Sequence, residues 1–142
     1  MEVRVLLVDD EQEFVETLSE RLGARGFEVR TAYSGEECLE RLQEAPADVV
    51  VLDVLMPGKG GLQTLREIKE ATPIIEVIML TGHGSIDTAI EGLKSGAYDY
   101  LKKPTETKNL IEKILRAYAR KSEQEERIRR AEIDKIVATR GW

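Results

Sequence analysis

A carboxylate follows the most apolar segment of the chain. Four apolar residues, Val49 to Leu52, run directly into Asp53, and residues 54–61 contain one proline and three glycines. The apolar run predicts a strand buried on both faces, and the Pro- and Gly-rich segment predicts a loop. Asp53 is therefore expected at the carboxyl end of an inner strand, where open α/β sheets bind ligands. The alternative, a helix N-cap aspartate, does not fit the non-helical pattern that follows.

Polar side chains also follow three other predicted strands. These are Asp9 and Asp10, Thr81, and Lys103. The carboxyl ends of parallel strands meet at one edge of a sheet, so these groups and Asp53 would share one crevice. Three carboxylates repel one another unless a cation joins them, and carboxylate oxygens without His or Cys suit Mg²⁺. A carboxylate nucleophile, a Mg²⁺, a lysine and a hydroxyl are the groups that transfer a phosphoryl group to an aspartate.

Strand and helix patterns alternate five times along the chain. Apolar or alternating runs predict strands at residues 3–8, 27–32, 49–52, 74–80 and 97–101. A helical pattern follows each run, with Ser34, Ser85 and Thr105 as plausible caps of the second, fourth and last helices. The alternation predicts an α/β fold with a doubly wound, five-stranded parallel sheet and helices on both faces.

Composition narrows the class of protein. The length of 142 residues fits one ordinary domain with a short appendage. A net charge of −6 gives no general attraction to nucleic acid or anionic membranes, and 5% aromatic residues are too few for a base-stacking surface. No apolar run approaches the ~20 residues of a membrane span, and the N-terminus shows no signal peptide. We therefore expect a cytoplasmic protein that binds neither nucleic acid nor membrane directly.

The single histidine, the single cysteine and the absence of a phosphate-binding loop motif exclude other kinds of site. The single histidine, His83, rules out a His-based metal site and a Ser-His-Asp triad. The single cysteine, Cys38, rules out an internal disulfide, and its helical neighbours indicate a small core residue. No Gly-x-x-x-x-Gly-Lys-Ser/Thr loop occurs, so nothing indicates nucleotide binding.

Four motifs in order resemble those of receiver domains of bacterial two-component response regulators. They are Val8-Asp9-Asp10-Glu11, Asp53 with Met56-Pro57-Gly58, Thr81-Gly82-His83-Gly84, and Asp99-Tyr100-Leu101-Lys102-Lys103-Pro104. The resemblance covers about residues 3–119, and residues 81–104 are most similar to receivers of the NtrC group. Gly60 departs from the pattern, because an aspartate is common there. The resemblance implies a flavodoxin-like sheet with strand order 2-1-3-4-5.

The resemblance also implies a role for each reactive residue. Asp53 would accept the phosphoryl group, Lys103 would pair with Asp53 and then with the phosphoryl oxygens, and Thr81 would bond the transferred group. Tyr100 would be an aromatic switch that turns inward as Thr81 moves. The Lys103–Pro104 bond is cis in such proteins. A sensor histidine kinase would be the phosphodonor, and a downstream effector or output domain would respond.

The same resemblance implies a Mg²⁺ site. Asp10 and Asp53 would bind the ion directly together with the backbone carbonyl of Leu55, and Asp9 would hold a metal-bound water. The protein would not be an enzyme beyond its own phosphorylation and dephosphorylation. One alternative is a haloacid-dehalogenase-type phosphohydrolase, but that class needs an aspartate where Leu55 stands. The other is a pseudo-receiver scaffold, which the intact site residues oppose.

Several of these residues can also be interpreted as purely structural, without a role in the chemistry. Asp9 and Asp10 could form an acidic first turn of a helix, and Glu11 is interpreted as only that. Tyr98 is expected on the opposite face of its strand from Tyr100. His83 is read as an exposed loop residue and Lys102 as a solvated charge.

The chain changes character after residue 119, so we expect a receiver domain at 1–119 and a charged helical tail at 120–142. No Pro or Gly interrupts residues 105–140, which predicts that the last receiver helix extends past Ala119. Three acid–base pairs at i, i+4 would support the extension: Glu123–Arg127, Glu125–Arg129 and Glu126–Arg130. Its apolar positions cannot form a core alone, so we expect its far end to pack on a second chain as a homodimer. A frayed, solvated tail is the alternative.

Overall fold

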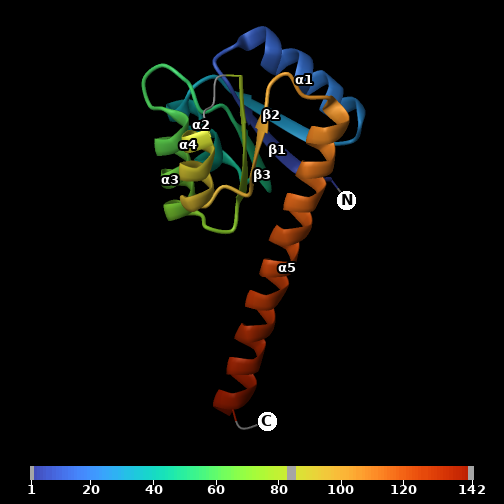
Figure 1. Cartoon of the computed structure of the whole chain (residues 1–142). Helices are drawn as coiled ribbons and strands as arrows, with labels where there is room; N and C mark the ends of the chain where they lie inside the picture. Colours follow the sequence, from blue (N-terminus) through green and yellow to red (C-terminus); the bar gives the residue numbers. More distant parts are fainter. Residues whose placement is uncertain (1, 83–85, 141–142) are drawn as a thin grey trace.

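Five parallel strands form one sheet at the centre of the protein. The computed structural model describes residues 2–82 and 86–140, and the strands lie in the order β2-β1-β3-β4-β5 (Figure 1). Their bounds are β1 Arg4–Val8, β2 Glu28–Ala32, β3 Val49–Leu52, β4 Glu76–Thr81 and β5 Asp99–Lys102. The helices that alternate with them are α1 Gln12–Ala24, α2 Gly35–Glu44, α3 Gly61–Ala71, α4 Ile86–Lys94 and α5 Thr107–Arg140. The predicted flavodoxin-like fold is confirmed.

The inner strands are buried on both faces, as their unbroken apolar runs predict. Val50 and Leu52 contribute to the core under α2 and α3, while Val49 and Val51 contribute to the core under α1 and α5. This division follows from the two-residue period of a strand, which sends successive side chains to opposite faces. Figure 1 shows the same layering, with α1 and the first turns of α5 on one side of the sheet. Cys38 is fully buried in the first of these cores, as expected.

Helix α4 approaches the sheet through a glycine. A Cβ atom at Gly92 would lie 2.0 Å from Cε of Met79, a distance that no real side chain could keep. Gly92 is also the buried residue of α4, whereas Ile86, Ile90 and Leu93 remain 79%, 45% and 45% exposed. The aliphatic face of α4 is thus largely in contact with solvent.

Local signals set most of the other boundaries. The Ser34 hydroxyl caps α2 by accepting a hydrogen bond from the Glu37 amide at 3.1 Å, as expected. Thr105 does not cap α5, because the helix begins at Thr107 and its Leu110 amide bonds the Glu106 carbonyl instead. The predicted cap Ser85 lies outside the described residues.

Tyr98 and Tyr100 have the predicted opposite orientations. Tyr98, which precedes β5, packs with the core under α1 and α5, and Tyr100, within β5, packs with the opposite core. Lys102 is exposed, as expected for a solvated charge.

Helix α5 runs without interruption to Arg140, and ion pairs hold it against the amino edge of the sheet. Lys121 is 5% exposed and pairs with the buried Asp48 at 3.0 Å, and Arg120 pairs with the buried Glu76 at 2.7 Å. Asp48 also accepts hydrogen bonds from the backbone amide and side chain of Arg4. Burial raises the pKa of Asp48, but the bonds from Arg4 and Lys121 outweigh burial and hold that pKa below its ordinary value.

These pairs define the start of a projecting segment, residues 122–140, which we call the stalk. Figure 1 shows the stalk extending away from the sheet. Two of the three predicted acid–base pairs are wrong in detail. Glu125 pairs with Lys121 at 3.1 Å rather than with Arg129, and Arg127 bonds Gln124 at 3.2 Å rather than Glu123. Glu125 lies one helical turn from Lys121, whose ammonium is buried, and pairs with it instead of with Arg129.

The third predicted pair, Glu126 with Arg130, is present at 3.3 Å. Glu126 also contacts Arg129 at 2.5 Å, so one acid serves two bases. The predicted helical extension is confirmed, whereas the division of the chain at 119/120 stays a prediction.

Replacing Lys121 by Met is expected to lower the free energy of unfolding by about 2 kcal/mol. The change removes one partner of a buried ion pair, while Arg4 still compensates part of the Asp48 charge. Lys135→Met, which removes the same charge from an exposed stalk position, should change stability by less than ~0.5 kcal/mol. Urea denaturation measures both. Equal losses in the two variants would contradict the assignment of Lys121 as an anchor of α5.

Candidate functional site

Backbone hydrogen bonds just past the strands place the polar residues at one edge of the sheet. The Asp53 amide donates to the Val8 carbonyl at 2.9 Å, and the Lys103 amide donates to the Thr81 carbonyl at 2.9 Å. Each bond continues the parallel ladder by one residue, so the side chains that follow β3 and β5 are fixed by the sheet rather than by a loop. This is the arrangement predicted from the strand ends.

The loop after Asp53 depends on a glycine. A Cβ atom at Gly61 would lie 2.3 Å from the backbone oxygen of Asp53 and 2.5 Å from Cα of Val54. The Gly61 amide donates to the Val54 carbonyl at 2.9 Å, which closes the loop. The start of α3 therefore packs directly against the backbone of Asp53, and any larger residue at 61 would displace it. Gly60 occupies the N-cap position of α3, where it has no side chain to cap the helix.

Three carboxylates meet at this edge. Oxygens of Asp9, Asp10 and Asp53 lie within 4.8 Å of one another. Asp9 is 3% exposed and Asp53 is 6% exposed, whereas Asp10 is on the surface. Burial and then the charge of Asp9 raise the pKa of Asp53 from 3.8 to about 6, against the opposing effects of Lys103, the Leu55 amide and the Thr81 side chain. The site is thus poised to favour a cation over a further negative charge.

Lys103 lies over this cluster, but it bonds a different acid from the one expected. Its ammonium donates to Asp9 at 2.5 Å and to Glu11 at 3.2 Å, and it interacts with Asp53 only through its charge. The expected pairing of Lys103 with Asp53 is therefore limited to attraction between the two charges, without direct contact. Both carboxylates are buried, and Lys103 neutralises the charge of Asp9 by direct contact. Burial lowers the pKa of Lys103, yet the bonds and charges of these acids raise it overall.

Two site residues were missed from the sequence. Glu11, interpreted only as an acid of the first helical turn, accepts a hydrogen bond from Lys103. The ring centroid of Phe14, a residue to which the sequence assigned no role at the site, lies 4.2 Å from the Lys103 ammonium in a cation–π contact. A signal was available for both, because residues at i and i+3 of a helix lie on one face. The partner at 103 could not be identified without the fold.

Thr81 and Tyr100 lie where the prediction placed them. Thr81 is the last residue of β4 and is fully buried, and its side chain hydrogen-bonds with Asp53. Tyr100 is half-buried on β5, opposite Met79 of β4. One residue of β4, Leu80, separates Thr81 from Met79, the strand position beside Tyr100. Thr81 and Tyr100 therefore lie on neighbouring strands, near the same end of the sheet.

The residues present fit a divalent cation. Asp10 makes no ion pair or hydrogen bond with another residue of the described ranges 2–82 and 86–140, so its carboxylate is available. The Leu55 amide donates to Asp53 at 3.3 Å, which places the Leu55 backbone beside the cluster, while its side chain is 53% exposed. The groups at the cluster that could bind a metal ion do so through oxygen atoms, the ligands that Mg²⁺ prefers. The second acid that a haloacid-dehalogenase site needs is missing at Leu55. His83 lies outside the described residues.

The fold and the site together define a class of protein. It is a doubly wound α/β domain with an acidic crevice at the point where the strand order reverses, between β1 and β3. The model of the response regulator receiver domain family matches residues 5–115. The chain belongs to this family of receiver domains, as its four motifs predict.

Relatives agree with this membership. The chain is 43% identical over 119 residues to the transcriptional regulatory protein CpxR of Klebsiella pneumoniae, covering 84% of this chain and 50% of that protein. It is 39% identical over 117 residues to ZraR of Escherichia coli K12, covering 82% of this chain and 26% of ZraR. The chain thus spans between about a quarter and a half of the length of these regulators.

Solved structures show the same fold. A receiver domain protein of Clostridium thermocellum superimposes with a TM-score of 0.81 at 41% identity, over 84% of this chain and 97% of that one. The receiver domain of NtrX from Brucella abortus superimposes with a TM-score of 0.77 at 35% identity, over 81% of this chain and 98% of that one.

Within the described ranges, no helix has both the length and the apolar character to cross a bilayer.

Proposed function

We propose that the chain accepts a phosphoryl group on Asp53 from a sensor histidine kinase and thereby switches the binding of a partner. The observation that carries the proposal is the convergence of Asp53, two further carboxylates, Thr81 and Lys103 at one sheet edge. In the reaction, an oxygen of Asp53 would attack the phosphorus of the donor. The bond from phosphorus to the donor's imidazole nitrogen would break, which leaves an aspartyl phosphate and a neutral histidine.

The neighbouring residues have distinct tasks in this proposal. Lys103 would exchange Asp9 for an oxygen of the transferred group, since it already lies above the cluster with three donors. Thr81 would exchange its bond with Asp53 for one with the same group. Tyr100 would follow Thr81 as the switch. No turnover of any other substrate is proposed.

Mg²⁺ is the cofactor proposed for this site. Asp10, Asp53 and the backbone carbonyl of Leu55 would hold it directly, and Asp9 would act through a bound water. When bound, the ion would neutralise charge on the transferred phosphoryl oxygens. The protein groups themselves orient the nucleophile and supply the donors.

A mass measurement tests the function. The chain incubated with acetyl phosphate and Mg²⁺ is expected to gain the mass of one phosphoryl group, and EDTA should prevent the gain. A chain that stays unmodified with Mg²⁺ would support a pseudo-receiver scaffold instead. Steady release of inorganic phosphate from unrelated phosphate esters would support a phosphohydrolase.

Mg²⁺ is expected to raise the melting temperature of the unmodified chain. The ion binds the native carboxylate cluster and relieves its repulsion, so millimolar Mg²⁺ should shift the midpoint by a few degrees. Asp10→Ala should remove most of this shift, because Asp10 is the exposed, unpaired ligand. Asp134→Ala, on the stalk, should leave it intact. A parent chain that melts at the same temperature with and without Mg²⁺ would contradict the site.

Partners and location follow from the receiver assignment as proposals. A histidine kinase would supply the phosphoryl group, and an effector or output domain would read the switch, in the cytoplasm. Neither nucleic acid nor membrane is proposed as a direct partner, because the net charge is −6.

A homodimer through the stalk is also proposed. Ile128, Ile133 and Ile136 are 53%, 52% and 52% exposed on a helix that the ion pairs at Arg120 and Lys121 hold in a fixed direction. Three half-exposed isoleucines on one projecting helix favour pairing with the same segment of a second copy.

Truncation after Glu125 tests the stalk, because it keeps both partners of the Lys121 ion pairs. The full chain is expected to show concentration-dependent dimers in sedimentation velocity, and the truncated chain to stay monomeric. A full-length double variant, Ile133→Gln with Ile136→Gln, should also be monomeric while keeping its helicity. If all three sediment as monomers at every concentration, the stalk is not a dimer element.

A further inference from the structure

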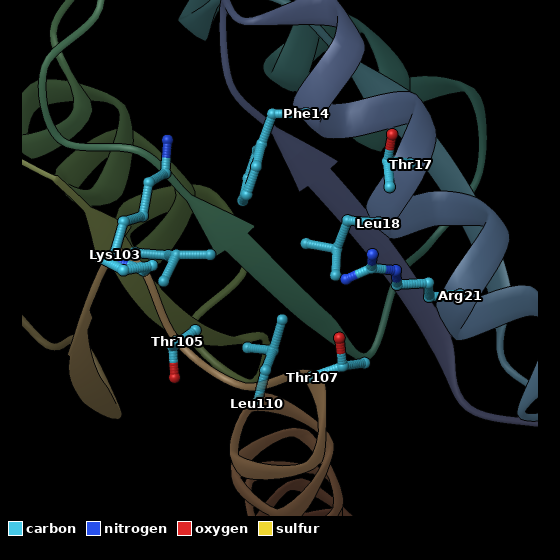
Figure 2. A pocket seen from close by; sticks show the side chains of 10 residues that line it. Phe14, Thr17, Leu18, Arg21, Lys103, Thr105, Thr107 and Leu110 are labelled. Atoms are coloured by element: carbon cyan, nitrogen blue, oxygen red, sulfur yellow. The ribbon is translucent and has the colours of Figure 1, made fainter.

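A hollow of about 220 Å³ lies between α1 and the start of α5, next to the acid cluster (Figure 2). The buried side chains of Leu18, Leu80 and Leu110 form its floor, and Phe14 and Pro104 form part of its wall. This volume lies below the ~300 Å³ at which typical small-molecule sites begin, so the hollow suits a molecule of fragment size.

Four polar residues around this floor have no side-chain partner among the described residues. Arg21, Thr17, Thr105 and Thr107 line the hollow, and none of their side chains makes a hydrogen bond or ion pair with another described residue. Figure 2 shows the Arg21 side chain pointing into the hollow. On α1, the residues one turn away from Arg21 include no acid that could neutralise it. The lining contains no carboxylate.

We propose that this hollow binds a small organic carboxylate, with its apolar body on the leucine floor and its carboxylate on Arg21. A guanidinium presents two parallel donors that match a carboxylate, and the threonine hydroxyls can bond its remaining lone pairs. The second cation of the lining, Lys103, is already bonded to Asp9 and Glu11. The site thus provides one unpaired positive charge for one negative charge.

The hollow shares two residues with the acid cluster. The stem of Lys103 lines it, and its ammonium lies over the Phe14 ring, which also lines it. A bound molecule would therefore pack against both. In the proposed phosphorylation, Lys103 must leave Asp9, so an occupant that restrains its stem should slow the reaction. This part of the inference rests on the proposed function, whereas binding itself does not.

Binding is tested on the unmodified full chain with benzoate as the probe. Methyl resonances of Leu18 and Leu110 are expected to shift and saturate in the millimolar range at constant ionic strength. Arg21→Gln should weaken this binding about fivefold or more, while Arg25→Gln, which removes the same charge from the end of α1, should not. Neutral benzamide should bind more weakly than benzoate. Absence of saturable shifts in the parent, or equal affinity in Arg21→Gln, would overturn the site.

The coupling is tested with the rate of mass gain from acetyl phosphate and Mg²⁺. Benzoate that saturates the parent is expected to slow it about twofold or more, and the concentration that gives half of this effect should be about fivefold or more higher for Arg21→Gln. An unchanged parent rate would overturn the coupling. A chain that binds benzoate but never gains phosphoryl mass would instead locate the failure in the proposed function.

Discussion

Asp53→Asn should abolish phosphorylation of the chain by acetyl phosphate. The amide keeps the shape of the carboxylate and can still accept the hydrogen bonds of the Leu55 amide and Thr81, but it has no anionic oxygen to attack phosphorus. The expected loss is complete within detection, because the other two acids are differently placed. Asp9 is bonded to Lys103, and Asp10 lies at the surface. Intact-protein mass spectrometry after incubation with Mg²⁺ gives the result.

The matched control for this variant is Asp134→Asn. It makes the same chemical change on the exposed stalk and should gain one phosphoryl group at the parent rate. If Asp53→Asn were modified as fast as the parent, the acceptor would have to be another residue. The proposed roles of Thr81 and Lys103 would then fail with it.

Asp53→Asn should also stabilise the metal-free fold at neutral pH. Burial and the charge of Asp9 raise the pKa of Asp53 from 3.8 to about 6, so its ionised form is less favourable in the folded chain than in the unfolded chain. Each pKa unit corresponds to about 1.4 kcal/mol, so removing the charge should raise the free energy of unfolding by about 2–3 kcal/mol at pH 7.5.

The sign of this effect reverses the usual behaviour of a carboxylate. The folded state binds the Asp53 proton more tightly, so this group lowers stability as pH rises from about 4 to about 6, and the loss is complete above that range. The advantage of Asp53→Asn should therefore shrink to about half at pH 5. Urea denaturation of both chains in EDTA, with Asp134→Asn beside them, measures the difference. An advantage that grows as the pH falls would contradict the raised pKa.

The fold was predictable because its signals are local. Val49 to Leu52 form an unbroken apolar run, and Ser34 marks a helix start by its own side chain. The edges of these elements were less certain. The last helix begins at Thr107 rather than after Thr105, since its first turn is set by backbone bonds that carry no side-chain signature. The alternation of strands and helices was enough to bring the strand ends together.

The pairing of charges was not predictable, because it depends on contacts between distant segments. Lys103 and Asp9 are 94 residues apart, and which of the neighbouring acids the lysine contacts is set by the folded geometry of the sheet edge. The pair between Lys121 and Asp48 was not predictable either, because the residues around Lys121 in the helix do not indicate that its side chain is buried. A sequence shows that opposite charges exist, but desolvation decides which of them pair.

The central claim, that Asp53 is the phosphoacceptor, is tested most directly by chemical trapping. Borohydride reduces an aspartyl phosphate to homoserine, and fragmentation of the digested protein then identifies the converted residue. After treatment with acetyl phosphate and Mg²⁺, homoserine is expected at position 53 and at no other aspartate. Homoserine at Asp9 or Asp10, or a phosphorylated chain without homoserine at position 53, would contradict the assignment.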